Sequence, residues 1–154
     1  MVLKKGSFVL KLSTKISNNL KPFCKKIIVA GSIRRRVKAP GDIDIVLIPK
    51  DRKKIFDLMN KKGKFLQGGQ KRDTFRIDGV KVELYFTTPE SWGATLFAYS
   101  SESGAAIGLR MVAKRKGLHL NQYGLFKNGK YLAGKTEQDI YKALGRPYKK
   151  PENR

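Results

Sequence analysis

Residues 28–50 read IVAGSIRRRVKAPGDIDIVLIPK, and they join two apolar runs through a Gly-Ser pair, three arginines and an Asp-Ile-Asp triplet. The β-branched run that ends at Ala30 predicts a strand, because glycine bounds it. Ala39-Pro40-Gly41 predicts a turn. Residues 42–48, whose first half alternates polar and apolar side chains, predict a second strand. We therefore expect two strands of one sheet, joined by an arginine-rich connection.

The second strand holds two carboxylates close together. Successive side chains of a strand point to opposite faces, so Asp42 and Asp44 would share one face. Two like charges at that spacing repel each other, and a cation between them relieves the repulsion. Carboxylate oxygens without a neighbouring His or Cys suit Mg²⁺ or Mn²⁺ better than Zn²⁺. The pair is therefore a candidate metal site, although a solvated strand face would show the same pattern.

The connection offers groups that bind phosphate. Gly31 and Ser32 follow the first strand and can direct backbone N–H groups and a hydroxyl at an anion. The arginines at 34–36 can clamp phosphate oxygens. Phosphate ligands next to metal-binding carboxylates are typical of sites for phosphoryl transfer. In this reaction, positioning and charge neutralisation account for most of the catalysis.

This order of features resembles the nucleotidyltransferase superfamily. Its form, GSIRR followed by GDID, is similar to the family X DNA polymerases, the group of polymerase beta. Residues 79–86 (GVKVELYF) resemble the strand that carries the third carboxylate of that family. Residues 120–126 and 136–148 resemble its C-terminal segments. Several matches in the same order are more specific than any one motif.

The resemblance implies an α+β fold with two lobes. Residues 1–87 would form a palm-like catalytic lobe with a mixed β-sheet flanked by helices, and residues 88–154 a small α+β thumb-like lobe. The implied reaction is DNA-directed addition of dNMP to a primer 3′-hydroxyl in short-gap repair, with two Mg²⁺ ions or with Mn²⁺. Asp42, Asp44 and Glu83 would be the catalytic and metal-binding residues, with Glu83 standing where the family normally has Asp.

Further residues are expected to contact the substrates. Gly31, Ser32 and Arg35 would bind the nucleotide, and the family resemblance implies that Tyr99 also contacts it. The basic loop at 68–72 is glycine-rich and can approach a nucleic-acid backbone closely. The expected DNA contacts are Lys71, Arg72, Lys81, Arg110 and Lys114, of which Lys81 and Arg110 come from the family resemblance.

The composition favours a polyanionic partner. The 154 residues contain 34 Lys and Arg against 12 Asp and Glu, a net charge of +22. Such charge opposes compaction unless a polyanion neutralises it. No apolar run approaches the ~18 residues that span a bilayer, so nucleic acid is favoured over a membrane. The single Cys and the absence of a signal-peptide pattern predict an intracellular protein associated with nucleic acid, and we expect a monomer.

The remaining pattern predicts the surrounding elements. Ser7 would cap a helix over 8–20 with Phe8, Leu12, Ile16 and Leu20 on one stripe. Thr87 or Thr88 would cap another, with Pro89 at its first position. Further expected elements are helices at 52–61 and 104–116, hairpins turning at 78–79 and 128–129, and a last helix opened by Thr136.

Two alternatives stay open at this stage. One is a nucleotidyltransferase with another acceptor, such as an RNA end, a protein or a small molecule. The other is a non-catalytic basic protein that binds nucleic acid. The residues before Ile27 are too few for the lyase domain that family members commonly carry, so we expect no deoxyribose-phosphate lyase activity.

Overall fold

The computed structural model describes residues 6–154. They form two compact units, of which the first ends at Phe86 and the second spans Thr87–Arg154. The helices and strands of the first unit are α1 (Gly6–Leu20), β1 (Cys24–Val29), α2 (Gly31–Arg34), β2 (Ile43–Pro49), α3 (Arg52–Lys62), β3 (Lys64–Gly68), β4 (Arg72–Ile77) and β5 (Val80–Phe86).

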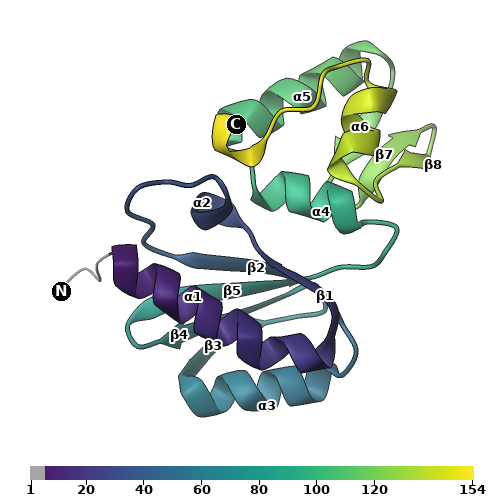
Figure 1. Cartoon of the computed structure of the whole chain (residues 1–154). Helices are drawn as coiled ribbons and strands as arrows, with labels where there is room; N and C mark the ends of the chain where they lie inside the picture. The colour runs from purple at the N-terminus through teal and green to yellow at the C-terminus, as the bar shows by residue number, and fades with distance from the viewer. Residues whose placement is uncertain (1–5) are drawn as a thin grey trace. The chain divides into compact units, whose positions relative to one another are not determined.

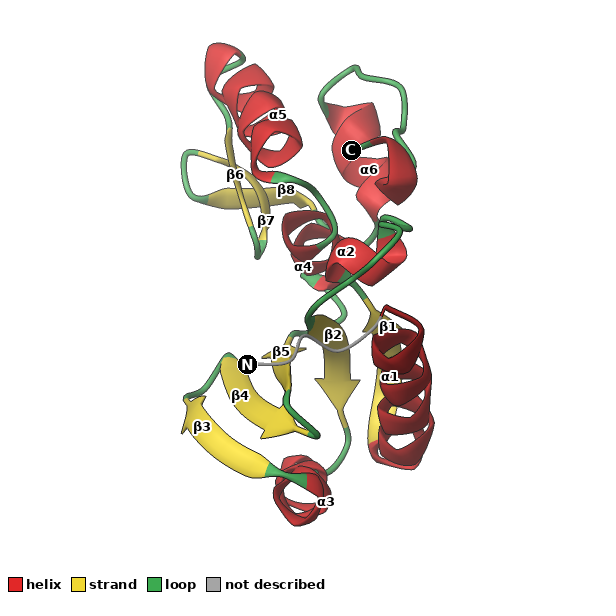
Figure 2. Cartoon of the chain, turned by 90° about the vertical axis from the view of Figure 1, so that its left-hand side faces the viewer, coloured by secondary structure: helices red, strands yellow, loops and turns green. Residues whose placement is uncertain are grey.

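The first unit is built on a five-stranded sheet in the order β1-β2-β5-β4-β3 (Figure 2). β2 and β5 are parallel, whereas the other neighbours are antiparallel, so the sheet is mixed. The predicted turn at Asp78-Gly79 joins β4 to β5, and both residues have positive φ angles of 50° and 79°. Such a turn matches the twist of a hairpin.

Two helices cover one face of this sheet. Figure 1 shows α1 and α3 on the same side of the strands. The core between them contains Ile43, Ile45 and Leu47 of β2 together with Val82 and Leu84 of β5. Since side chains alternate along a strand, the even residues of β2 and the odd residues of β5 lie on the opposite face. That face carries Asp44 and Glu83 together with the buried apolar residues Val46 and Ile48.

The buried stripe of α1 differs from the predicted one. Val9, Leu12, Ile16 and Leu20 are buried, whereas Phe8 is 37% exposed. α1 also includes Ser7, so the prediction that Ser7 caps it is wrong. The spacing of three and then four residues fits the helical period better than a strict repeat of four, because 3.6 residues make one turn. Burial of each such side chain contributes about 1.5–3 kcal/mol.

The second unit combines helices with a small sheet. Its helices and strands are α4 (Trp92–Tyr99), α5 (Ser103–Arg115), β6 (His119–Asn121), β7 (Gly124–Lys127), β8 (Lys130–Ala133) and α6 (Glu137–Ala143). β6, β7 and β8 form an antiparallel sheet in that order. Its core includes Phe97 of α4, Leu109 of α5, Leu125 of β7 and Ile140 of α6.

Local signals explain the ends of these elements. Thr136 caps α6 as predicted, because its Oγ1 accepts a hydrogen bond of 3.0 Å from the backbone N–H of Asp139. The predicted cap of α4 is wrong: Ser91 is the N-cap, and Pro89 lies in the preceding turn. Thr88 accepts a bond from the Ser91 N–H inside that turn. No helix of residues 6–154 has the length and hydrophobicity needed to cross a membrane.

Candidate active site

The two central parallel strands bring two of the predicted carboxylates together. Asp44 of β2 lies directly opposite Glu83 of β5 in the register of the sheet. Both residues belong to the face that α1 and α3 leave uncovered. The strands of the two motifs are therefore neighbours in the sheet, a pairing that neither motif specifies alone.

A tyrosine joins these carboxylates. The hydroxyl of Tyr85 contacts Oδ1 of Asp44 at 3.2 Å and donates a hydrogen bond to Oε2 of Glu83. Tyr85 is only 6% exposed. Sequence analysis included Tyr85 in the segment 79–86 but gave it no role. The signal was its spacing of two residues from Glu83, which puts both side chains on one face of β5.

The Asp44 carboxyl is held in an unfavourable environment for its charge. Burial and then the negative charge of Glu83 raise its pKa from 3.8 to about 6, and the charge of Asp42 adds to the shift. The Tyr85 hydrogen bond and the Lys81 charge act in the opposite direction. A carboxyl with this shift is typical of functional sites.

Glu83 is perturbed in the opposite sense. Burial pushes its pKa upward, but hydrogen bonds from Tyr85 and Lys81 and the charges of Lys81 and Arg72 outweigh this, so the pKa lies below its ordinary value. Nζ of Lys81 is 3.3 Å from Oε1 of Glu83. Glu83 is therefore ionised, with one oxygen near a lysine and the other near a tyrosine.

Asp42 is arranged differently from the prediction. β2 begins at Ile43, so Asp42 precedes the strand and is exposed. Across residues 6–154, no three His, Cys, Asp or Glu side chains are gathered closely enough to hold a metal ion. The donor chemistry nevertheless fits a hard cation, because carboxylate oxygens are hard ligands and the negative charges of Glu83 and Asp42 both help to raise the pKa of Asp44.

A glycine turn packs against the Asp44 carboxylate. Gly31 has a φ angle of 60°, and a β-carbon on it would lie 2.2 Å from Oδ2 of Asp44. The N–H of Ala30 donates a hydrogen bond of 2.7 Å to the Asp44 carbonyl. The Gly-Ser motif therefore starts beside the carboxylate. The one-turn helix α2 that follows was not predicted, and Ser32 lies within it while Arg35 is its C-cap.

The predicted basic loop connects β3 to β4. Lys71 and Arg72 are exposed there. Arg72 is opposite Tyr85 in the register, which brings its charge near Glu83. Sequence analysis missed Arg52 at the start of α3. Its guanidinium donates hydrogen bonds to the carbonyls of Gly69 and Gln70 and lies 3.8 Å from the centroid of the Phe86 ring. An aliphatic side chain at position 52 could not make these hydrogen bonds to the loop.

The other predicted contacts belong to the second unit. Tyr99 ends α4 and is partly exposed. Arg110 and Lys114 are exposed on α5 and one turn apart, so they share a face of that helix. Their proposed roles stay predictions.

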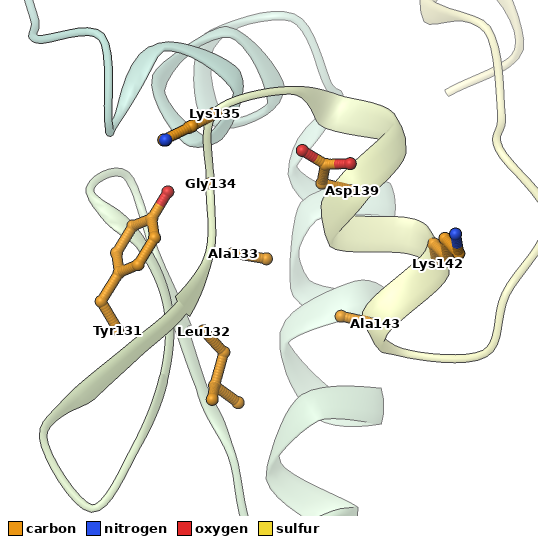
Figure 3. A pocket seen from close by; sticks show the side chains of 8 residues that line it. All are labelled: Tyr131, Leu132, Ala133, Gly134, Lys135, Asp139, Lys142 and Ala143. Carbon is orange, nitrogen blue, oxygen red and sulfur yellow. The ribbon is translucent and has the colours of Figure 1, made fainter.

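The second unit also contains a cavity of about 550 Å³. Figure 3 shows Ala133 of β8 and Ala143 of α6 on opposite walls of it. None of the predicted site residues lines this cavity. Four of its lining residues, Tyr131, Lys135, Asp139 and Lys142, are polar or charged.

Comparison with known proteins agrees with this geometry. Residues 106–154 match the family model for the DNA polymerase beta thumb. Repair DNA polymerase X of African swine fever virus is 30% identical over 147 residues, covering 88% of this chain and 84% of the viral protein. The DNA polymerase/3′-5′ exonuclease PolX of Bacillus subtilis is 25% identical, and the match covers 96% of this chain but 28% of that protein.

Solved structures show the same fold. A ternary P/T complex of Leishmania infantum polymerase beta aligns with a TM-score of 0.84 at 19% identity, covering 98% of this chain and 77% of that one. The predicted α+β fold with a mixed sheet is therefore confirmed. Three observations point to the same family. They are the order of the sequence motifs, the pairing of Asp44 with Glu83 beside a glycine turn, and a viral relative that is matched over most of its length. We conclude that this chain belongs to the family X DNA polymerases and is a nucleotidyltransferase of that family.

Proposed function

We propose that this chain adds dNMP to a primer 3′-hydroxyl in short-gap repair of DNA. The observation that carries the proposal is the in-register pair of Asp44 and Glu83 on parallel strands, with the Gly31 turn packed against Asp44. Acidic groups beside a phosphate-binding turn match the needs of phosphoryl transfer, in which charge must be neutralised and reactants aligned.

The three carboxylates are proposed to hold Mg²⁺, with Mn²⁺ as a substitute. Asp42 and Asp44 would hold two ions, and Glu83 would help to hold the one near the primer. When bound, such ions lower the pKa of the attacking hydroxyl and offset the charge of the leaving pyrophosphate. Asp42 is exposed on a loop, which allows it to adjust to the ion.

The chain's own groups are proposed to orient the nucleotide. Gly31 and Ser32 begin α2, where backbone N–H groups and the Ser32 hydroxyl can bind triphosphate oxygens. Arg35 would add a charge-assisted hydrogen bond. Because the Gly31 backbone lies against Asp44, the proposed phosphate ligands would lie next to a proposed metal ligand. Tyr99 would contact the sugar or base.

DNA is the proposed macromolecular partner. The net charge of +22 supplies general attraction to a polyanion. Lys71, Arg72 and Lys81 would contact the backbone from the first unit, and Arg110 and Lys114 from α5. Lys81 would exchange its ion pair with Glu83 for a phosphate oxygen. The monomeric state and the intracellular location stay predictions.

Primer extension with Asp44→Asn tests the proposal. The variant removes one charge at the site and should abolish incorporation of labelled dNTP on gapped DNA, while DNA binding measured by fluorescence anisotropy persists. Asp57→Asn is the matched control, because Asp57 is exposed on α3, which covers the other face of the sheet. Incorporation that survives in Asp44→Asn would contradict the proposal. Parallel reactions with NTPs and with RNA or protein acceptors test the choice of substrate.

A further inference from the structure

We propose that Tyr85 is a positioning residue that keeps Asp44 and Glu83 in a metal-free arrangement and competes with a divalent cation for them. Its hydroxyl lies between the two carboxylates, at 3.2 Å from Oδ1 of Asp44 and in a hydrogen bond to Oε2 of Glu83. The inference rests on the proposed function, because it takes these carboxylates as metal ligands.

The position of the hydroxyl follows from the sheet. Asp44 and Glu83 are partners in the register of β2 and β5, and Tyr85 is two residues beyond Glu83 on the same face. Tyr85 is only 6% exposed, so the ring has little room to turn the hydroxyl into solvent. A shorter hydroxyl side chain at this position would not span both carboxylates.

The charges at the site make the hydroxyl more than a packing contact. Lys81 is 3.3 Å from Oε1 of Glu83, so both oxygens of Glu83 have donors from β5 itself. A phenol carries one proton, and it can donate to only one carboxylate at a time. The hydroxyl therefore relieves the repulsion between Asp44 and Glu83 only in part. A divalent cation relieves it more fully, but it must take over the oxygen atoms that face the hydroxyl.

Removal of the hydroxyl should consequently strengthen metal binding. The free energy of one hydrogen bond to a charged group corresponds to a roughly tenfold change in affinity. Loss of the Tyr85 hydrogen bond should therefore change the affinity for the metal ion by about this factor. Tyr85→Phe removes only the hydroxyl and keeps the buried ring, so the sheet packing is preserved. We expect it to bind Mn²⁺ roughly tenfold more tightly than the unchanged chain in the absence of DNA and nucleotide.

Titration of the full chain with Mn²⁺ in neutral buffer, followed by electron paramagnetic resonance of the free ion, measures this affinity. Tyr131→Phe is the matched control. It also deletes one tyrosine hydroxyl that donates a hydrogen bond, here to the carbonyl of Glu90 at 2.7 Å in the second unit. Adding Asp44→Asn to Tyr85→Phe should remove the gain, which assigns the bound ion to this site. Circular dichroism verifies that each variant is folded.

The outcomes separate the inference from the proposed function. Tighter Mn²⁺ binding by Tyr85→Phe, lost with Asp44→Asn, together with half-maximal incorporation at a lower Mg²⁺ concentration, supports the inference. Equal or weaker Mn²⁺ binding by folded Tyr85→Phe, or no binding by either protein, overturns it. The proposed function is judged separately by whether Asp44→Asn loses incorporation in the otherwise unchanged chain.

Discussion

Gly31 lies so close to Asp44 that a β-carbon on it would be 2.2 Å from the Oδ2 atom of the carboxylate. Gly31 also has a φ angle of 60°, in the left-handed region where other residues cost roughly 1–2 kcal/mol. The same glycine thus serves the turn after β1 and the close approach of the backbone to the carboxylate. A side chain here would displace Asp44 and not only the loop.

Gly31→Ala should therefore lower kcat/KM for nucleotide incorporation by roughly 100-fold, the effect expected when a catalytic group moves by about 1 Å. Steady-state primer extension measures the change. Gly41→Ala is the control, because a β-carbon on Gly41 would meet nothing within 4 Å. If Gly31→Ala is folded and as active as Gly41→Ala, the close approach has no functional meaning.

The raised pKa of Asp44 predicts how the first unit responds to pH. A carboxyl whose pKa rises from 3.8 to about 6 on folding favours the folded state while protonated, and this contribution is lost as pH rises through about 6. Asp44→Asn should thus stabilise the metal-free protein by about 2 kcal/mol at neutral pH, after allowance for partial exposure. The gain should vanish below pH 3.8.

Hydrogen exchange of the amides in β2 and β5, with chelator present, measures that difference as a function of pH. Asp57→Asn gives the background for an exposed carboxyl on α3. A stabilisation that grew toward acid pH would have the wrong sign and would disprove the assignment.

Arg154 forms a buried ion pair with Glu137 in the second unit. Nη1 of Arg154 is 2.5 Å from Oε2 of Glu137, and the guanidinium lies 5.3 Å from the centroid of the Phe97 ring. Removing one partner leaves the other charge buried, which typically costs about 3–5 kcal/mol. Arg154→Ala should destabilise this unit by that amount, whereas the exposed Arg146→Ala should change little.

The single tryptophan makes the measurement simple. Trp92 is buried in α4, so its fluorescence during urea unfolding reports on the second unit. Equal unfolding midpoints for Arg154→Ala and Arg146→Ala would refute the importance of the pair.

Arg52 is expected to fix the loop that carries Lys71. Its guanidinium binds the carbonyls of Gly69 and Gln70 and lies 3.6 Å from Oδ1 of Asp73. Arg52→Met keeps the aliphatic stem and removes these contacts. We expect faster hydrogen exchange over residues 69–72 and weaker DNA binding, with Lys53→Met as the neighbouring control. Unchanged hydrogen exchange in this loop would show that the β3–β4 hairpin is ordered without the Arg52 contacts.

The exposed pair on α5 should contribute to the salt dependence of DNA binding. If Arg110 and Lys114 each neutralise one phosphate, changing both to alanine should reduce the slope of log K against log salt by roughly 1.8. Lys53→Ala with Lys61→Ala removes the same charge from α3, on the covered side of the sheet. Equal slopes for the two double variants would show that Arg110 and Lys114 do not contact the DNA phosphates.

The sequence determined much of the local structure, because short signals act over a few residues. The strand before Gly31, the hairpin at Asp78-Gly79 and the cap at Thr136 follow from β-branched runs, turn residues and a hydroxyl that accepts a nearby N–H. Phe8 was misjudged because a strict repeat of four residues drifts away from the helical period of 3.6. Pro89 was misjudged because α4 starts three residues later, at Trp92.

The motifs also identified Asp44 and Glu83, but nothing in either segment fixed their separation. They are 39 positions apart in the chain, and only the parallel pairing of β2 with β5 makes them neighbours. That pairing depends on the helices α1 and α3 burying the other face of both strands. Tyr85 gains its place between the carboxylates, and Gly31 its place against Asp44, from long-range packing that no local pattern encodes.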